Sequence, residues 1–175
     1  MITKITRDKH GVIRTDLMSG TKDASRLRSV KYMGAGDTET EIDNGCVVAL
    51  SGLMDGEREV YKAVTPAANT AADKIVVIAN PEVMYDERLK QLEDYYNEAG
   101  KTIRGYIPQK NTDIASFTPE CLEFTGTPKK GWTVELMAGT KLKVVQTATA
   151  SSTKMGEIID VETVGARTYY VVSFC

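Results

Sequence analysis

Short apolar runs, separated by clusters of turn-forming residues, recur along most of this chain. Residues 46–50 and 75–79 are continuously apolar, and residues 59–64 alternate between apolar and polar side chains. Runs of this kind, bounded by Gly, Pro, Asn and Asp, are typical of β-strands. Asn44-Gly45 is a strong turn signal before the first run, and residues 52–56 interrupt the chain before the alternating run, so residues 41–64 are predicted to form a β-hairpin. Many strands of this length indicate an antiparallel β-barrel or β-sandwich.

The second half of the chain repeats this pattern. Strands are predicted within residues 102–107, 113–117, 132–137, 141–146, 157–163 and 167–174. Gly139 is placed to turn one hairpin, and Gly165 joins the last two strands. We therefore predict a mainly β (α+β) body over residues 37–175. A division of this body into two sub-barrels, 37–110 and 111–175, is an open alternative.

Residues 86–99 are the one segment with a helical pattern. Leu89, Leu92 and Tyr96 would lie on one face, acidic residues occupy the first turn, and Gly100 follows as a stop. The pattern predicts a surface helix that packs against the body through one row of side chains. Four tyrosines near this helix either form a contact surface or pack the helix onto the sheet. They are Tyr85, Tyr95, Tyr96 and Tyr106.

The first part of the chain differs from the rest in charge. Residues 1–32 carry eight basic and three acidic side chains, whereas the other residues carry 14 basic and 21 acidic ones. This part has only isolated apolar pairs, and Gly34 and Gly36 mark a junction after it. We therefore predict an extended basic arm over residues 1–36 that meets an acidic surface. A solvated terminus is the alternative.

The cysteines and the hydropathy restrict the class of protein. Cys46, Cys121 and Cys175 are odd in number and widely spaced, so neither a disulfide framework nor a zinc site is indicated. Cys46 lies in an apolar run and is expected to be a buried, reduced thiol. The longest apolar runs are too short to span a bilayer, and no signal-peptide pattern is present. A protein made in a cytoplasm is therefore predicted.

The residue types that catalysis requires are sparse or badly placed. The single histidine, His10, lies in the predicted arm, where no rigid scaffold would position it beside a nucleophile. Carboxylates are abundant, but their spacing is that of solvated loops and not of a calcium-binding loop. The sequence therefore predicts no enzyme, no metal site and no cofactor. An overlooked active site would be expected near Asp86 and Glu87.

Four segments of the body carry a family resemblance. They are residues 44–53 (NGCVVALSGL), 56–66 (GEREVYKAVTP), 78–87 (IANPEVMYDE) and 134–144 (VELMAGTKLKV). These segments resemble the head-decoration, or capsid cement, proteins of tailed bacteriophages, which lie on the capsid beside the major capsid protein. The likeness covers most of residues 44–175 and leaves the arm largely unmatched.

The resemblance implies a virion structural protein that binds the outer surface of an icosahedral capsid and stabilises the shell. Its partners would be the major capsid protein and neighbouring copies of itself, with a trimer as one option. It would be made in the host cytoplasm and reside on the capsid exterior. In this interpretation the arm contacts the capsid, and its candidate partner-binding residues are Arg7, Arg14, Arg26, Arg28 and Tyr32.

A function of another class is compatible with the same residues. A nucleic-acid-binding or carbohydrate-binding β-barrel module would use a groove around Trp132 and the tyrosines. The body is acidic and the sequence pI is about 5.5, which argues against nucleic acid as the ligand of the body.

Overall fold

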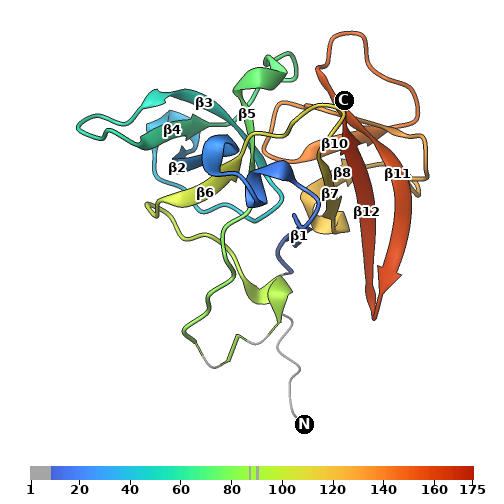
Figure 1. The fold of residues 1–175 in the computed structure, drawn as a ribbon, viewed down its shortest axis with the longest axis horizontal. Coiled ribbons are helices and arrows are strands. Elements are labelled where there is room, and N and C mark those ends of the chain that lie inside the picture. The colour runs from blue at the N-terminus through green and yellow to red at the C-terminus, as the bar shows by residue number, and fades with distance from the viewer. Residues whose placement is uncertain (1–8, 87, 90) are drawn as a thin grey trace.

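The computed structural model describes residues 9–86, 88–89 and 91–175. Over these residues the protein is mainly β, as predicted. A closed five-stranded barrel lies beside a seven-stranded sheet (Figure 1). The boundary between them falls between residues 106 and 114, close to the predicted division of the body into two parts.

The barrel is built mainly from the first half of the chain. Its strands are β2 (Leu27–Met33), β3 (Val47–Leu53), β4 (Val60–Val64), β5 (Ile75–Ile78) and β6 (Ile103–Tyr106). They follow each other around the barrel in the order β2-β4-β3-β5-β6, and β6 pairs with β2 to close it. β2 and β4 are parallel, and the other neighbours are antiparallel. The predicted hairpin over residues 41–64 is confirmed as β3 and β4.

The seven-stranded sheet has the order β1-β7-β12-β11-β9-β10-β8. Its strands are β1 (Ile13–Arg14), β7 (Ile114–Phe117), β8 (Leu122–Phe124), β9 (Thr133–Glu135), β10 (Leu142–Val145), β11 (Lys154–Val164) and β12 (Arg167–Phe174). The two hairpins predicted here are confirmed as β9–β10 and β11–β12. Within the described residues, six 3-10 turns connect the strands: η1 (Ser19–Thr21), η2 (Ala24–Arg26), η3 (Ala35–Asp37), η4 (Ala72–Lys74), η5 (Leu92–Asp94) and η6 (Pro119–Cys121).

Strand β5 and the first three residues of β3, 47–49, are continuously apolar and buried on both faces. One face of each lies inside the barrel, where Val48 and Val76 belong to one core cluster. The other face lies against the seven-stranded sheet, where Val47 and Val77 join a second, larger cluster. Successive side chains of a strand point to opposite faces, so a strand between two cores needs apolar residues at every position. This explains why these two runs do not alternate.

The first part of the chain is integrated into both sheets, which corrects the predicted arm over residues 1–36. β2 is a barrel strand, and β1 pairs with β7 at the edge of the seven-stranded sheet. Val12, Met18 and Val30 are buried. These isolated apolar residues pack on strands that are distant in sequence, and the local composition does not reveal such contacts. Residues 1–8 lie outside the described residues.

The predicted helix over residues 86–99 is wrong over the described part of this segment. Only the 3-10 turn η5 is present there, and residues 87 and 90 lie outside the described residues. The backbone of Asn97 exchanges two hydrogen bonds of 3.0 Å with Ile42, and the Glu93 carbonyl accepts one from the His10 N–H. A helix of about three turns is marginal by itself, so bonds to other parts of the chain decide the conformation.

The three cysteines differ in accessibility, which predicts their reactivity. Cys46 and Cys121 are buried, as expected for Cys46, whereas Cys175 is partly exposed. Burial raises the pKa of the Cys46 thiol to about 11 and also raises the pKa of the Cys121 thiol. Because the thiolate is the reactive form, we expect one thiol to react rapidly with an aromatic disulfide reagent in the folded protein. The other two should react only after denaturation, and two rapid thiols would contradict the described packing.

Candidate protein-binding surface

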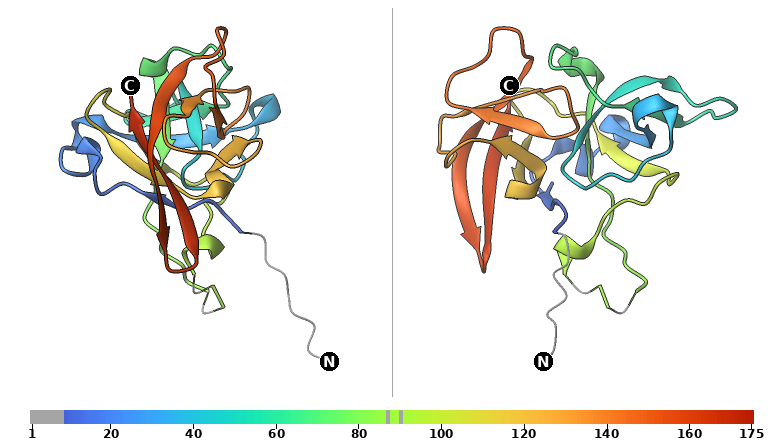
Figure 2. Two further views of the ribbon diagram at one scale, coloured as in Figure 1. Left: turned by 90° about the vertical axis from the view of Figure 1, so that its right-hand side faces the viewer. Right: turned by 180° about the vertical axis from the view of Figure 1, so that it is seen from behind.

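The long connection between β5 and β6, residues 79–102, projects from one end of the molecule (Figures 1 and 2). The turn of the β11–β12 hairpin points to the same end in all three views. η5 is the one helical turn among the described residues of this connection. Loops that are held by a rigid scaffold often carry binding residues. This connection is therefore the leading candidate for a binding surface.

Asparagine side chains fix the two ends of the connection. Asn44, just before β3, accepts a hydrogen bond from the Asn80 N–H at 3.0 Å and donates one to the Asn80 carbonyl at 2.9 Å. Asn97 donates from Nδ2 to Asn44 Oδ1 at 3.1 Å and to the Ile42 carbonyl at 2.9 Å. The Tyr95 hydroxyl accepts a bond from Asn80 and donates one to Asn97. Asn44 and Asn97 are buried, so these bonds satisfy groups that water does not reach.

Replacing Asn97 by alanine is expected to lower the free energy of unfolding by about 1–3 kcal/mol, because buried partners lose their bonds. Hydrogen exchange of the residue 79–102 amides should accelerate more than exchange in β7 and β12. Urea denaturation and amide exchange measure the two effects. Asn69, which is exposed, provides the matched control, and its replacement by alanine should change stability by less than about 0.5 kcal/mol. Equal losses for both variants would contradict the anchoring role.

Distant elements hold the middle of the connection. Arg167 Nε, at the start of β12, donates to the Glu93 carboxylate at 2.8 Å, and this bond raises the pKa of the Arg167 guanidinium. The His10 ring stacks on Tyr96 with 4.9 Å between the ring centroids. Nδ1 of the same ring lies 2.8 Å from Asp43 Oδ1. The connection is thus tied to the N-terminal segment and to the last hairpin, as well as to the barrel.

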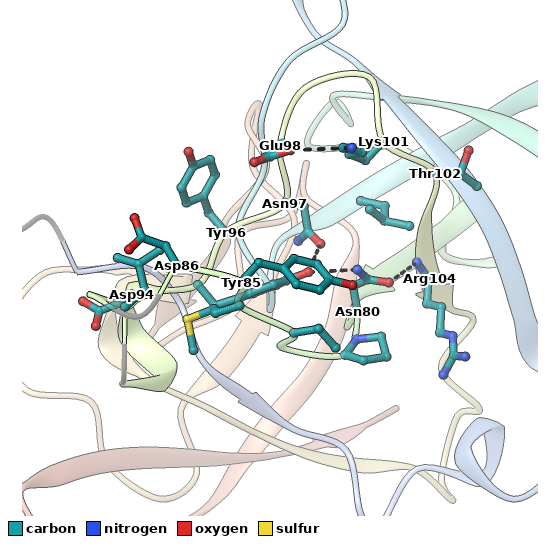
Figure 3. A pocket seen from close by; sticks show the side chains of 16 residues that line it. Asn80, Tyr85, Asp86, Asp94, Tyr96, Asn97, Glu98, Lys101, Thr102 and Arg104 are labelled. Atoms are coloured by element: carbon teal, nitrogen blue, oxygen red, sulfur yellow. Dashed lines mark hydrogen bonds and ion pairs between the residues drawn. The ribbon is translucent and has the colours of Figure 1, made fainter.

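A hollow of about 630 Å³ opens between this connection and β6 (Figure 3). Aromatic, aliphatic and polar groups line it, among them Tyr85, Tyr96, Met84, Ile103 and Asn80. Its rim carries charges of both signs, including an ion pair of 3.8 Å between Glu98 and Lys101. Half of the lining residues are polar or charged, so the hollow is more polar than a typical small-molecule site.

Large apolar side chains are exposed around this hollow and at the nearby hairpin turn. Tyr85 is 94% exposed and Val83 57%. Leu92 in η5 is 41% exposed, and Val164 at the end of β11 is 53% exposed. Exposed apolar residues that gather at one end of a protein often mark an interaction site. We refer to these four residues as the apolar end.

The residues predicted to bind a partner do not come together. Arg14 in β1 lies 3.6 Å from Glu162 and 5.8 Å from the centre of the Tyr169 ring. Arg26 is in η2, and Arg28 in β2 donates to the Ser25 and Leu27 carbonyls. Arg7 lies outside the described residues. Arg26 and Arg28 therefore lie at the start of the barrel strand β2, whereas Arg14 reaches the β11–β12 hairpin.

Tyr32, the fifth predicted binding residue, requires a correction. It is buried, and its hydroxyl shares a hydrogen bond of 2.8 Å with Thr65 Oγ1. A side chain inside the barrel core cannot contact a partner. Side chains along β2 alternate between buried and less buried positions, and Tyr32 occupies one of the buried positions.

The sequence interpretation missed Asn44, Asn80 and Asn97. A signal was present, because Asn44 precedes a glycine and Asn80 precedes a proline, but such pairs indicate turns and not buried hydrogen-bond partners. Of the four tyrosines near the predicted helix, Tyr85 is exposed and Tyr106 is buried. The group thus contains both an exposed and a buried tyrosine.

Trp132 lies at a second hollow, of about 400 Å³, with residues of β8 and β10. Tyr85, Tyr95 and Tyr96 line the first hollow and not this one. Trp132 and these three tyrosines therefore line two separate hollows.

The carboxylates give little indication of a metal centre. Within the described ranges, no three His, Cys, Asp or Glu side chains are grouped as metal ligands. Asp86, near the position suggested for an overlooked active site, accepts a hydrogen bond of 2.7 Å from Arg88, and Glu87 lies outside the described residues.

No protein-family model, no curated protein and no solved structure matches this chain. None of the helical turns in the described part of the chain is long and apolar enough to cross a membrane.

Proposed function

We propose that this protein binds other proteins through the apolar end, and that its partner is the outer surface of a tailed-phage capsid. One observation carries the proposal: large apolar side chains are exposed on a connection that hydrogen bonds anchor at Asn80, Glu93 and Asn97. Anchoring restricts the conformations open to the connection before binding, so less conformational entropy is lost when a partner binds. The protein would stabilise the shell by contacting it from outside.

Tyr85 is the expected centre of this contact. Tyrosine combines a large apolar ring with a hydroxyl, and it is enriched among the residues that dominate interface energies. Val83 and Leu92 would exclude water around it. The adjoining hollow offers space for a side chain of the partner.

The sequence resemblance supports the capsid as the partner. Of the four segments that resemble head-decoration proteins, residues 44–53 contain β3 and residues 56–66 contain β4. Residues 78–87 lead from β5 into the connection and include Val83 and Tyr85. The resembling segments thus include two of the four residues of the apolar end.

Sedimentation with capsids tests this proposal. The purified protein is mixed with undecorated expanded phage capsids, with unexpanded proheads and with bare DNA, and the bound fraction is measured after pelleting. We expect saturable binding to expanded capsids, at a stoichiometry that fits the icosahedral lattice. Retention on DNA without binding to any capsid would overturn the proposal.

The Tyr85→Ala variant locates the contact. We expect it to bind capsids at least about 30-fold more weakly than the natural protein, the effect of losing one dominant interface residue. Its thermal unfolding should be unchanged because the side chain is exposed. Leu17 is 61% exposed, lies between β1 and η1 and is not one of the four residues of the apolar end, so Leu17→Ala is the control and should bind normally. Equal binding by both variants would remove the apolar end from the interface.

A further inference from the structure

The second hollow lies among β8, β9 and β10 and uses none of the residues of the apolar end. Trp132 and Phe124 form its aromatic part. Glu123, Lys143 and Gln146 supply a carboxylate, an ammonium group and an amide. Trp132 is the only tryptophan of the chain.

The two aromatic residues are held in place by the sheet. The Trp132 carbonyl accepts a hydrogen bond of 2.9 Å from the Ile158 N–H, and the Trp132 N–H donates one of 3.1 Å to the Lys129 carbonyl. The Phe124 ring meets Tyr170 edge-on, with 5.6 Å between the ring centroids. Both aromatic residues also pack against the larger core cluster. The hollow therefore has a fixed backbone and fixed aromatic walls.

The charges of the hollow balance. Glu123 in β8 lies opposite Lys143 in β10 in the parallel pairing of these strands. Lys143 Nζ also lies 3.6 Å from the carboxylate of Glu135, which is buried and accepts two hydrogen bonds from Thr149. A phosphate or a nucleic-acid backbone would require an excess of positive charge, which this hollow lacks. The charge balance favours a neutral ligand.

We propose that this hollow is a saccharide-binding site. A sugar ring presents an apolar face of C–H groups, which stacks on an aromatic side chain, and a rim of hydroxyls, each both a donor and an acceptor. Trp132 and Phe124 match the apolar face. The carboxylate of Glu123 accepts, the ammonium group of Lys143 donates, and the amide of Gln146 does both. A volume of about 400 Å³ is near the lower end for ligand sites and suits one or two sugar rings.

The single tryptophan makes the test direct. The full chain is titrated with glucose, galactose, mannose, N-acetylglucosamine and their disaccharides up to tens of millimolar, and the tryptophan emission is recorded. At least one sugar should shift the emission with a saturable curve, whereas glycerol at equal mass concentration should not. Absence of any saturable shift, or equal shifts with glycerol, would overturn the proposal. The outcome is independent of capsid binding.

Variants of the polar residues that line the hollow complete the test, and they leave Trp132, whose emission is recorded, unchanged. Gln146→Ala and Glu123→Gln change exposed side chains, so both should fold normally and bind the same sugar at least about tenfold more weakly. Asn69→Ala removes an exposed amide elsewhere and should leave sugar binding unchanged. Unchanged affinity in both hollow variants would show that the emission responds to another site, and the assignment would fail.

Discussion

Replacing Phe117 by alanine is expected to lower the free energy of unfolding by about 3–5 kcal/mol, the loss typical of a buried phenylalanine. Phe117 lies in β7, between β1 and β12, and its side chain is fully buried. Its ring meets Phe174 edge-on, with 6.4 Å between the ring centroids. It belongs to the core cluster that also contains Val47 and Val77 of the barrel. Removing the ring would therefore open a cavity in the core that the two sheets share.

Urea denaturation measures this loss, and two further variants control it. Phe124→Ala removes a half-buried ring from the same sheet and should cost clearly less. Phe117→Leu keeps most of the volume and should cost less than about 1.5 kcal/mol, which keeps the test valid even if Phe117→Ala does not fold. A loss for Phe117→Ala no larger than for Phe124→Ala would contradict the described core.

Replacing Gly45 by alanine is expected to cost about 2–5 kcal/mol. Gly45 has a φ of +81°, a conformation that costs a residue with a Cβ about 1–2 kcal/mol. A Cβ at this position would also overlap the Sγ atom of Cys121, which is fully buried. Such overpacking typically adds about 1–3 kcal/mol. Urea denaturation again gives the total.

The Gly126→Ala variant separates the cost of the backbone conformation from the cost of the overlap with Cys121. The Gly126 φ of +82° is nearly the same, but a Cβ there would meet no atom within 4 Å. Gly126→Ala should therefore cost only the backbone term of about 1–2 kcal/mol. In a Cys121→Ala background, the additional cost of Gly45→Ala should shrink because the overlapping sulfur is gone. If Gly45→Ala and Gly126→Ala were equally destabilising, the overlap with Cys121 would be absent.

Strands were predictable where local pattern and tertiary environment agree. Residues 46–50 and 75–79 are strands because their apolar density requires two buried faces, and the chain supplies a core on each side. The glycine turns at Gly45 and Gly165 require φ values above zero, which glycine adopts without strain. The residue 86–99 segment was not predictable, because its helical pattern competes with hydrogen bonds to Ile42 and His10, which are distant in sequence.

The candidate binding surface was only partly predictable. The cluster of tyrosines indicated the region of the candidate surface, but the prediction placed the partner-binding residues in an arm near the start of the chain. Charge along the sequence suggested that arm, whereas Arg14 and Tyr32 make contacts within the fold. The ionic and hydrogen-bond partners of such side chains depend on which strands are neighbours. The topology of the sheets determines those neighbours.

The sequence by itself determined that this chain is mainly β, where most strands and hairpin turns lie, and that Cys46 is buried. These features follow from the two-residue period of strands, from the freedom of glycine at positive φ, and from the burial of apolar runs. Only the tertiary structure decided that Leu27–Met33 closes a barrel, that residues 79–102 form an anchored connection, and that Tyr85 is exposed while Tyr32 is buried. Each of these depends on contacts between residues far apart in the chain, for which a local pattern carries no information.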